Sequence, residues 1–289
     1  MNSSMDGKVV LVTGGNSGIG KAAATSLAEM GAEVVLLCRN REKAEKAVSD
    51  ITSSSGRPVD LIIADMLLQN EVRRAASEFI STRSRLDVLL NNAGSDFVSY
   101  QETEDGIERT MALNYFSQFL FTNLLIPTLR KSTPSRIVNV SSAGHYGASL
   151  DFGNINGKGD MGTGGLGAYG RSKLALILFT YELARRLQGS GVTANCLHPG
   201  AVRTNIWSHA GLFSPLTRLA SLFMISPDEG AKTSVYLASS PEVEGVTGKY
   251  FEKCKPKRSS EQSYDEAAAA RLWELSERMT GLVAQPATP

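Results

Sequence analysis

The sequence predicts an α/β protein made of one doubly wound domain, with helices on both faces of a mostly parallel sheet. Short β-branched runs alternate with amphipathic helical segments from residue 8 onward. Alternation of this kind builds right-handed crossovers, which place consecutive strands parallel to one another. The chain of 289 residues shows no linker, repeat or change of composition. We therefore assign 1–289 to a single domain.

Each predicted element has its own signature, a short apolar run for a strand or apolar residues at helical spacing for a helix. Seven strands are expected, at 8–13, 33–38, 59–64, 87–90, 136–141, 192–198 and 248–252. Helices are expected between them, at 18–30, 41–53, 69–83, 104–131 and 169–188. A last helix at about 261–280 would cover one edge of this seven-stranded sheet.

Composition and charge exclude several classes of protein. Hydrophobic residues make up 42% of the chain, which is enough for a sizeable core, and the net charge of +1 argues against a nucleic-acid partner. The chain contains no run of about 18 apolar residues, so the sequence predicts no transmembrane helix. The 3 cysteines and 3 histidines are too scattered for a metal site, and no secretory signal opens the chain. We expect a soluble cytoplasmic protein without a metal.

A glycine-rich loop, TGGNSGIG at 13–20, follows the first predicted strand and leads into a helix. Glycine lets the backbone approach a ligand closely, and the N-terminus of a helix attracts a pyrophosphate. The order of strand, loop and helix favours a Rossmann-type dinucleotide site over a tight turn that binds nothing. The contacts expected from this loop are Gly14, Asn16, Ser17, Gly18, Ile19 and Gly20.

The ends of two later strands point to the same ligand. Asp65 ends the third strand region, where its carboxylate could accept from an adenine amino group. The stretch NNAG follows the fourth strand, at the carboxyl edge where open α/β sheets bind ligands. Asn91 equally suits a turn-stabilising role. Further cofactor contacts are therefore expected at Asp65, Met66, Asn92, Ala93 and Gly94.

The end of the second strand bears on the choice between NAD and NADP. A fold that selects NAD usually holds the ribose with an acidic residue here, and none occurs between 34 and 41. Arg39 and Asn40 stand there instead. Because an arginine can pair with a 2′-phosphate in a bidentate way, the sequence favours NADP(H). The alternative is that Arg39 is only a solvated charge.

Tyr169 and Lys173 lie four positions apart on a predicted helix, so their side chains stand together. A free tyrosine has a pKa of about 10. A nearby ammonium favours the phenolate, as does the positive charge of an oxidised nicotinamide ring, and together they would bring that pKa closer to neutral, where proton transfer is efficient. Ser141 and Ser142 end the fifth strand at the same sheet edge, where a hydroxyl could hold a reacting oxygen. Alone, the spacing of tyrosine and lysine carries no meaning.

These motifs together resemble the short-chain dehydrogenase/reductase family. The resemblance rests on TGxxxGIG, NNAG, a lone asparagine in a long helix, a strand-end serine and YxxxK, and it runs from about Lys8 to Phe251. It implies that the catalytic residues are Asn114, Ser142, Tyr169 and Lys173, with Ser142 preferred as the second serine of its pair. The loop HPGAVRT after the sixth strand matches the family's nicotinamide-side loop. Further cofactor contacts are thus implied at Pro199, Gly200, Val202 and Thr204, and at Tyr169 and Lys173.

The interval between Ser142 and Tyr169, 27 positions, is longer than in common family members. With DFGNING inside the interval, the chain resembles the retinol dehydrogenase-like branch, which interconverts lipophilic alcohols and aldehydes, often with NADP(H). The vertebrate members carry an N-terminal membrane anchor, and this sequence reaches its first strand at residue 8, so we do not transfer the substrate name. The apolar stretch 205–225 fits a substrate lid, a membrane-surface contact, or ordinary core packing.

The resemblance implies an NADP(H)-dependent oxidoreductase that interconverts a lipophilic carbonyl compound and its alcohol. Tyr169 would transfer the proton, Ser142 would hold the oxygen, and Lys173 would lower the pKa of the tyrosine and bind the ribose. Asn114 would complete a relay to solvent. Family members commonly pair through the two long helices, which implies a homodimer or homotetramer. The alternative is an NADP(H)-binding sensor without catalysis, while the TGxxxGIG spacing disfavours a sugar epimerase or dehydratase.

Overall fold

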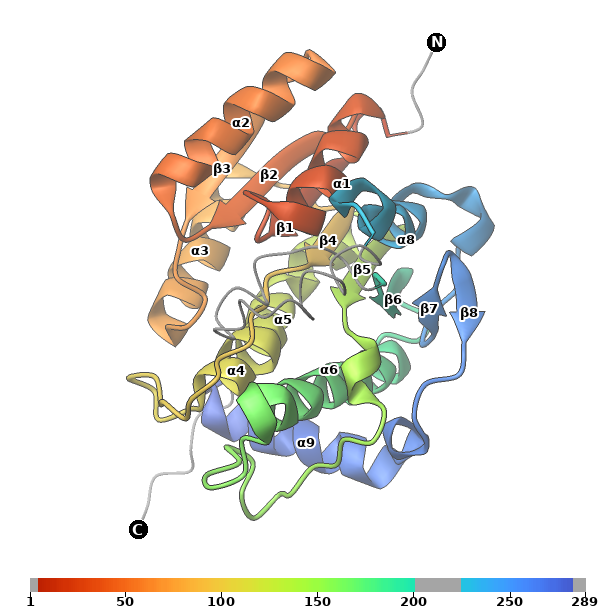
Figure 1. Ribbon diagram of the computed structural model, residues 1–289. Coiled ribbons are helices and arrows are strands. Elements are labelled where there is room, and N and C mark those ends of the chain that lie inside the picture. The colour runs from red at the N-terminus through yellow and green to blue at the C-terminus, as the bar shows by residue number, and fades with distance from the viewer. Residues whose placement is uncertain (1–4, 201–224, 283–289) are drawn as a thin grey trace.

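The computed structural model describes residues 5–200 and 225–282 and is built around one sheet (Figure 1). The sheet has eight strands in the order β3-β2-β1-β4-β5-β6-β7-β8. The pairs from β3 to β7 are parallel, and only β7 and β8 are antiparallel. The strands are β1 (Val9–Thr13), β2 (Glu33–Cys38), β3 (Val59–Ile63), β4 (Val88–Asn91), β5 (Ser135–Val140), β6 (Val192–His198), β7 (Tyr250–Glu252) and β8 (Lys255–Lys257).

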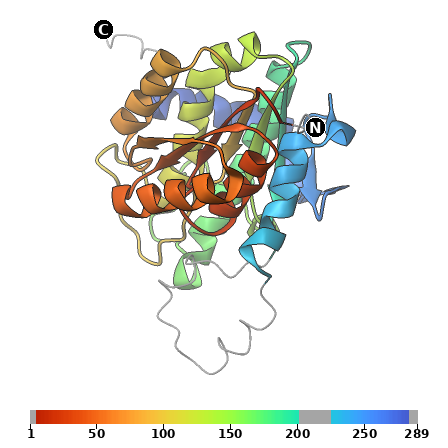
Figure 2. The same ribbon diagram turned by 90° about the horizontal axis from the view of Figure 1, so that it is seen from above.

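Helices cover both faces of this sheet, as a doubly wound fold requires. Figure 2 shows α8 (cyan) on the same side as α1 (red), and α9 (blue) on the opposite side. The helices are α1 (Gly18–Glu29), α2 (Arg41–Ser55), α3 (Gln69–Thr82), α4 (Arg109–Met111), α5 (Ser117–Lys131), α6 (Leu166–Arg186), α8 (Pro227–Ser239) and α9 (Glu266–Met279). None of the helices in the described ranges is long and apolar enough to cross a membrane.

Alternating residues of the strands feed two separate apolar layers. Along β1, Val10 and Val12 pack in the layer that includes Leu27 of α1, whereas Leu11 packs in the layer that includes Phe79 of α3. Both layers exclude water, and every residue of β1 is buried. Strands buried on both faces appear in the sequence as continuous apolar runs. This is why the buried strands could be predicted from short β-branched segments.

The prediction of seven strands was wrong by one strand at the C-terminal edge. Lys253 and Cys254 adopt positive φ values of 50° and 58°, and the chain reverses between β7 and β8 at these two residues. A two-residue hairpin turn of this kind is usually marked by Asn-Gly or Asp-Gly. Because neither residue is of that type, the sequence carried no signal for β8.

Two predicted helices begin at other residues than expected. The helix predicted from 104 begins only at Arg109, because Glu108 caps it by accepting from the backbone N–H groups of Thr110 and Met111, at 2.8 and 2.9 Å. The helix predicted from 169 begins earlier, at Leu166. Gly165, with a φ of 83°, turns the chain into it. Tyr169 therefore lies in the first turn of α6.

The C-terminal helix α9 lies on the face that α5 and α6 form together (Figure 1). The ring centroid of Trp273 lies 5.0 Å from that of Phe119 and 5.7 Å from that of Phe179. The guanidinium carbon of Arg186 lies 4.2 Å from the centroid of the Trp273 ring. We expected two copies of the chain to pair through these long helices. α9 covers part of these helices, and the oligomeric state stays a prediction.

Candidate active site

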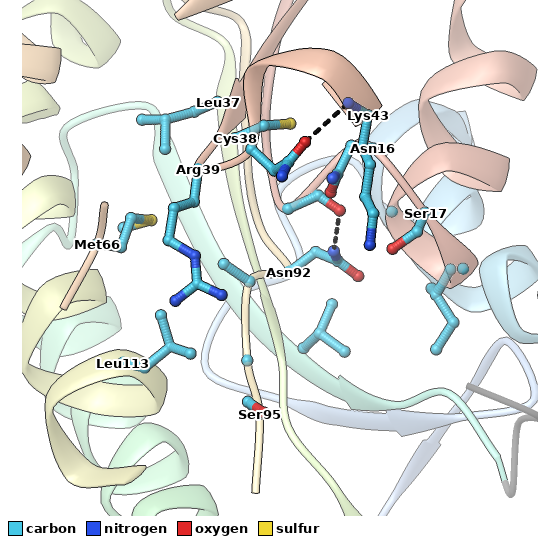
Figure 3. A pocket seen from close by; sticks show the side chains of 18 of the residues that line it. Asn16, Ser17, Leu37, Cys38, Arg39, Lys43, Met66, Asn92, Ser95 and Leu113 are labelled. Atoms are coloured by element: carbon cyan, nitrogen blue, oxygen red, sulfur yellow. Dashed lines mark hydrogen bonds between the residues drawn. The ribbon is translucent and has the colours of Figure 1, made fainter. Parts of the chain in front are cut away.

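A cleft of about 790 Å³ opens at the carboxyl ends of the central strands (Figure 3). Most of the predicted cofactor residues line it: Gly14, Asn16, Ser17, Gly18, Ile19, Gly20, Arg39, Asn40, Asp65, Met66, Asn92, Ala93, Gly94, Tyr169, Lys173 and Pro199. Gly200 does not line the cleft. Its φ is 94°, and a Cβ at this position would clash with the Ile225 side chain. Val202, Thr204 and nearly all of the predicted lid at 205–225 lie outside the described residues.

The glycine loop between β1 and α1 approaches the segment after β4 so closely that side chains would not fit. A Cβ on Gly14 would lie 3.0 Å from the Ala93 Cα, and a Cβ on Gly20 would clash with the side-chain amide of Asn92. Ser17 precedes α1 without capping it through its side chain, and the first turn of α1 holds no acidic residue. The first N–H groups of α1 therefore have no side-chain acceptor, and they fit a pyrophosphate.

The segment after β4 is fixed to the end of β1 by hydrogen bonds. The backbone N–H groups of Asn92 and Ala93 both donate to the Thr13 hydroxyl, at 2.9 Å. The Asn92 side chain donates to the carbonyl of Thr13 at 3.0 Å. Asn91 instead points into the core and donates to Thr122 and Asn139 at 2.8 and 2.9 Å. Asn91 is therefore a structural residue, whereas Asn92 and Ala93 form the wall of the cleft.

Two cations extend into the cleft near the end of β2, and only one of them was predicted (Figure 3). Arg39 follows β2 and is 64% exposed, with its Nη1 3.7 Å from the Oδ2 of Asp65. Lys43 comes from the first turn of α2, where Asn40 caps the helix by accepting from the Lys43 backbone N–H at 2.9 Å. Lys43 could have been found from sequence, since it lies one helical turn beyond Arg39.

Tyr169 lines the cleft, and Ser142 lies beside it without being one of the residues that line the cleft. The Ser142 hydroxyl lies close enough to the Tyr169 hydroxyl to lower the pKa of that tyrosine. Its Oγ also accepts from the backbone N–H of Gly144 at 3.1 Å. The Ser141 hydroxyl points elsewhere and donates to the carbonyl of Lys173 at 3.0 Å. A Cβ on Gly144 would lie 3.3 Å from the Tyr169 ring, so this turn packs directly on the ring.

Lys173 is buried one helical turn beyond Tyr169. Its Nζ donates to the carbonyl of Val140 at 2.9 Å and lies 5.6 Å from the centroid of the Tyr169 ring. Burial lowers the pKa of Lys173 to about 8. A lysine with such a pKa is still mostly an ammonium at pH 7.

The pKa of Tyr169 departs from its ordinary value in the direction opposite to the one we expected. Burial raises this pKa, and the charge of Asp96 adds to the rise, while the hydrogen bond from Ser142 opposes it. In the protein by itself, burial therefore outweighs the effect expected of Lys173, and the joint effect of Lys173 and an oxidised nicotinamide on the Tyr169 pKa stays a prediction. The physical reason is that burial disfavours the phenolate more than the distant ammonium favours it.

Asn114 connects the wall of the cleft to α6 from a single turn of π-helix at Ala112–Phe116. Its side-chain amide donates to the Ser95 carbonyl at 2.9 Å and to the Ser172 hydroxyl at 3.0 Å, and its Oδ1 accepts from the Ser95 N–H at 2.9 Å. A π-turn within a helix often marks a functional site. The side chain holds Ser95 and α6 together and does not itself line the cleft.

Sequence reasoning missed several residues that line the cleft. They are Leu37, Cys38, Lys43, Ala64, Ser95, Phe97, Leu113, Val140, Ser141 and Pro227. Most of them belong to strand ends or to the loops that follow, where apolar residues carry no chemical signature.

Comparison with known proteins places this architecture in a family. The family model of short chain dehydrogenases matches residues 8–212. Retinol dehydrogenase 14 from Homo sapiens is 44% identical, over 96% of this chain and 88% of its own length. A protein of known structure from Mycobacterium paratuberculosis is 32% identical with a TM-score of 0.77, over 96% of this chain and 94% of its own.

A short chain dehydrogenase from Shigella flexneri, solved in complex with NADP, is 27% identical with a TM-score of 0.70, over 88% of this chain and 100% of its own. The match of the family model extends from β1 through Tyr169 and Lys173 of α6 to the end of β6 and beyond. The chain therefore belongs to the short chain dehydrogenase family and is an oxidoreductase that acts on CH–OH groups.

Proposed function

We propose that this chain interconverts a lipophilic aldehyde or ketone and its alcohol with NADP(H), through Ser142, Tyr169 and Lys173. One observation carries the proposal. Tyr169 lines the same cleft as the glycine loop, and a Cβ on Gly144 would lie 3.3 Å from the Tyr169 ring and 3.6 Å from the Ser142 Oγ, so the two side chains are neighbours. A hydride donor and a proton donor can thus face one carbonyl group from a single cleft.

The residues of the reacting end have distinct tasks in this proposal. When bound, the nicotinamide ring supplies or accepts the hydride. In reduction the Tyr169 hydroxyl donates its proton to the carbonyl oxygen, and the Ser142 hydroxyl donates a hydrogen bond to that oxygen. Lys173 keeps a positive charge near the phenol, and with the charge of an oxidised nicotinamide it would oppose the effect of burial on the tyrosine pKa. Asn114 holds Ser95 and α6 in register.

The preference for NADP(H) rests on the two cations beside the end of β2. Arg39 and Lys43 both line the cleft, and no acidic residue takes the place that would hold a ribose 2′-hydroxyl. Asp65, the neighbouring carboxylate, has one oxygen engaged by the N–H of Leu67 at 3.0 Å and the other near Arg39. The Shigella flexneri relative, solved with NADP, supports the same choice.

Replacing either cation is expected to weaken NADPH binding and to leave NADH binding nearly unchanged. A charge-assisted hydrogen bond contributes about 1.5–3 kcal/mol, so Arg39→Ala or Lys43→Ala should raise the KM for NADPH roughly tenfold or more. Arg41→Ala is the matched control, because Arg41 neighbours both residues but pairs with Glu45 outside the cleft. If the ratio of kcat/KM for NADPH to kcat/KM for NADH were the same in Arg39→Ala as in the wild type, the proposed basis of the NADP preference would be rejected.

A lipophilic substrate follows from the apolar residues around the cleft and from one relative. It rests on the apolar side chains of Phe97 and Leu113 in the cleft, on the apolar composition of 205–225, and on the similarity to retinol dehydrogenase 14. A series of aldehydes of increasing chain length, assayed with NADPH and NADH in parallel, tests it. We expect kcat/KM to rise with chain length. Tight NADPH binding without turnover of any compound would instead support the sensor alternative.

A further inference from the structure

His145 is completely buried next to Ser142 and is hydrogen-bonded through both ring nitrogens. Its Nδ1 lies 2.6 Å from the carbonyl oxygen of Ser142. Its Nε2 lies 3.1 Å from the backbone nitrogen of Ser260, which donates to it. A carbonyl can only accept and a backbone N–H can only donate, so the ring is the neutral tautomer with its proton on Nδ1.

The surroundings of the ring hold it in this neutral state. Burial lowers the pKa of His145, and the charge of Lys257 acts in the same direction. The ring centroid of Tyr146 lies 4.0 Å away and that of Tyr250 lies 5.0 Å away, so the imidazole is packed against aromatic rings. From β6, His198 accepts from the backbone N–H of Ala143 at 3.2 Å. Residues 142–146 are therefore supported from two sides.

Ser260 belongs to a segment of residues 258–264 that is itself attached to α6. The Tyr181 hydroxyl of α6 lies 2.7 Å from the Ser259 hydroxyl, which lies 2.6 Å from the Ser263 hydroxyl. The Tyr146 hydroxyl donates to the carbonyl of Arg258 at 2.7 Å. The helix that carries Tyr169 is thus connected, through the segment 258–264 and His145, to the backbone of Ser142.

We propose that His145 is a positioning residue, which fixes the backbone of Ser142 and thereby keeps the Ser142 hydroxyl beside Tyr169. The proposal rests on the function proposed above. A displacement of about 1 Å in a reacting group is enough to cost roughly 100-fold in rate. His145 does not line the cleft, so any effect on the reaction would pass through the backbone of Ser142.

Two substitutions each remove one of the two hydrogen bonds that the ring makes. His145→Asn keeps a donor near the Ser142 carbonyl and loses the acceptor for Ser260. His145→Gln keeps an acceptor near Ser260 and loses the donor to Ser142. The 13C chemical shift of the Tyr169 Cζ, assigned by comparison with Tyr169→Phe, reports on the surroundings of the phenol. In the cofactor-free proteins, we expect this chemical shift to change in His145→Gln and to stay the same in His145→Asn. This readout needs no turnover, so it is independent of the proposed function.

Kinetics give the second readout. We expect kcat to fall about tenfold or more in His145→Gln and much less in His145→Asn, with the Kd for NADPH unchanged in both. Melting temperatures should fall in both variants, because each loses one buried hydrogen bond. If the Tyr169 signal of folded His145→Gln matches the wild type, or if both variants lose kcat equally, His145 is only a structural residue. Absence of turnover in the wild type would instead reject the proposed function.

Discussion

Tyr169→Phe is expected to lower kcat for carbonyl reduction by about 10²–10⁴-fold while NADPH binding stays nearly unchanged. The variant keeps the aromatic ring, which packs against the turn at Gly144, and loses only the hydroxyl that Ser142 contacts. The chemical step then lacks its proton donor, whereas the glycine loop and the cations at Arg39 and Lys43 remain. Steady-state kinetics with NADPH, together with a fluorescence titration of NADPH binding, would measure both effects.

A control for this substitution is a tyrosine that is hydrogen-bonded but remote from the cleft. Tyr236 of α8 donates to Glu242 at 3.0 Å and does not line the cleft, so Tyr236→Phe should retain full activity. Reductase activity of Tyr169→Phe at the level of the wild type would reject Tyr169 as the proton donor. A parallel loss of NADPH binding would mean that the hydroxyl holds the cofactor instead of transferring a proton.

Much of the fold was accessible from the sequence because its central strands are buried on both sides. β2 and β6 appear where the sequence predicted them, residue for residue, since parallel strands under two layers of helices are continuous apolar runs. The glycine loop was recognisable for a similar reason. Its residues at Gly14 and Gly20 are required by close backbone approach, and the sequence shows them directly.

The rest depends on contacts between residues that are far apart in the chain. The hydrogen bond between Ser260 and His145 joins positions separated by 115 residues, and no local pattern announces it. The placement of α9 depends on the packing of the Trp273 ring against the rings of Phe119 and Phe179. The pKa of Tyr169 depends on how deeply α6 is buried, and the spacing of YxxxK contains no information about burial.

Lys173→Met is expected to abolish most of the activity and, at the same time, to stabilise the folded protein by about 1–2 kcal/mol at pH 7. Lys173 is 3% exposed, and burial lowers its pKa from 10.5 to about 8, so that folding at neutral pH must bury a charge. One pKa unit corresponds to about 1.4 kcal/mol, which puts the cost of burying this charge at about 3 kcal/mol. Loss of the hydrogen bond to Val140 would offset about 1–1.5 kcal/mol of the gain.

The pH dependence of this gain separates the charge from the shape of the side chain. The folded pKa of Lys173 lies below its unfolded value, so its cost is fully present below about pH 8 and declines as the pH rises toward 10.5. The difference in unfolding free energy between Lys173→Met and the wild type, measured by urea denaturation, should therefore shrink from pH 7 to pH 10. Lys46→Met, on an exposed face of α2, is the control and should show no such trend. A variant less stable than the wild type at pH 7 would mean that the Val140 hydrogen bond outweighs the buried charge. With the predicted result, the active site keeps a destabilising ammonium because the reaction requires it.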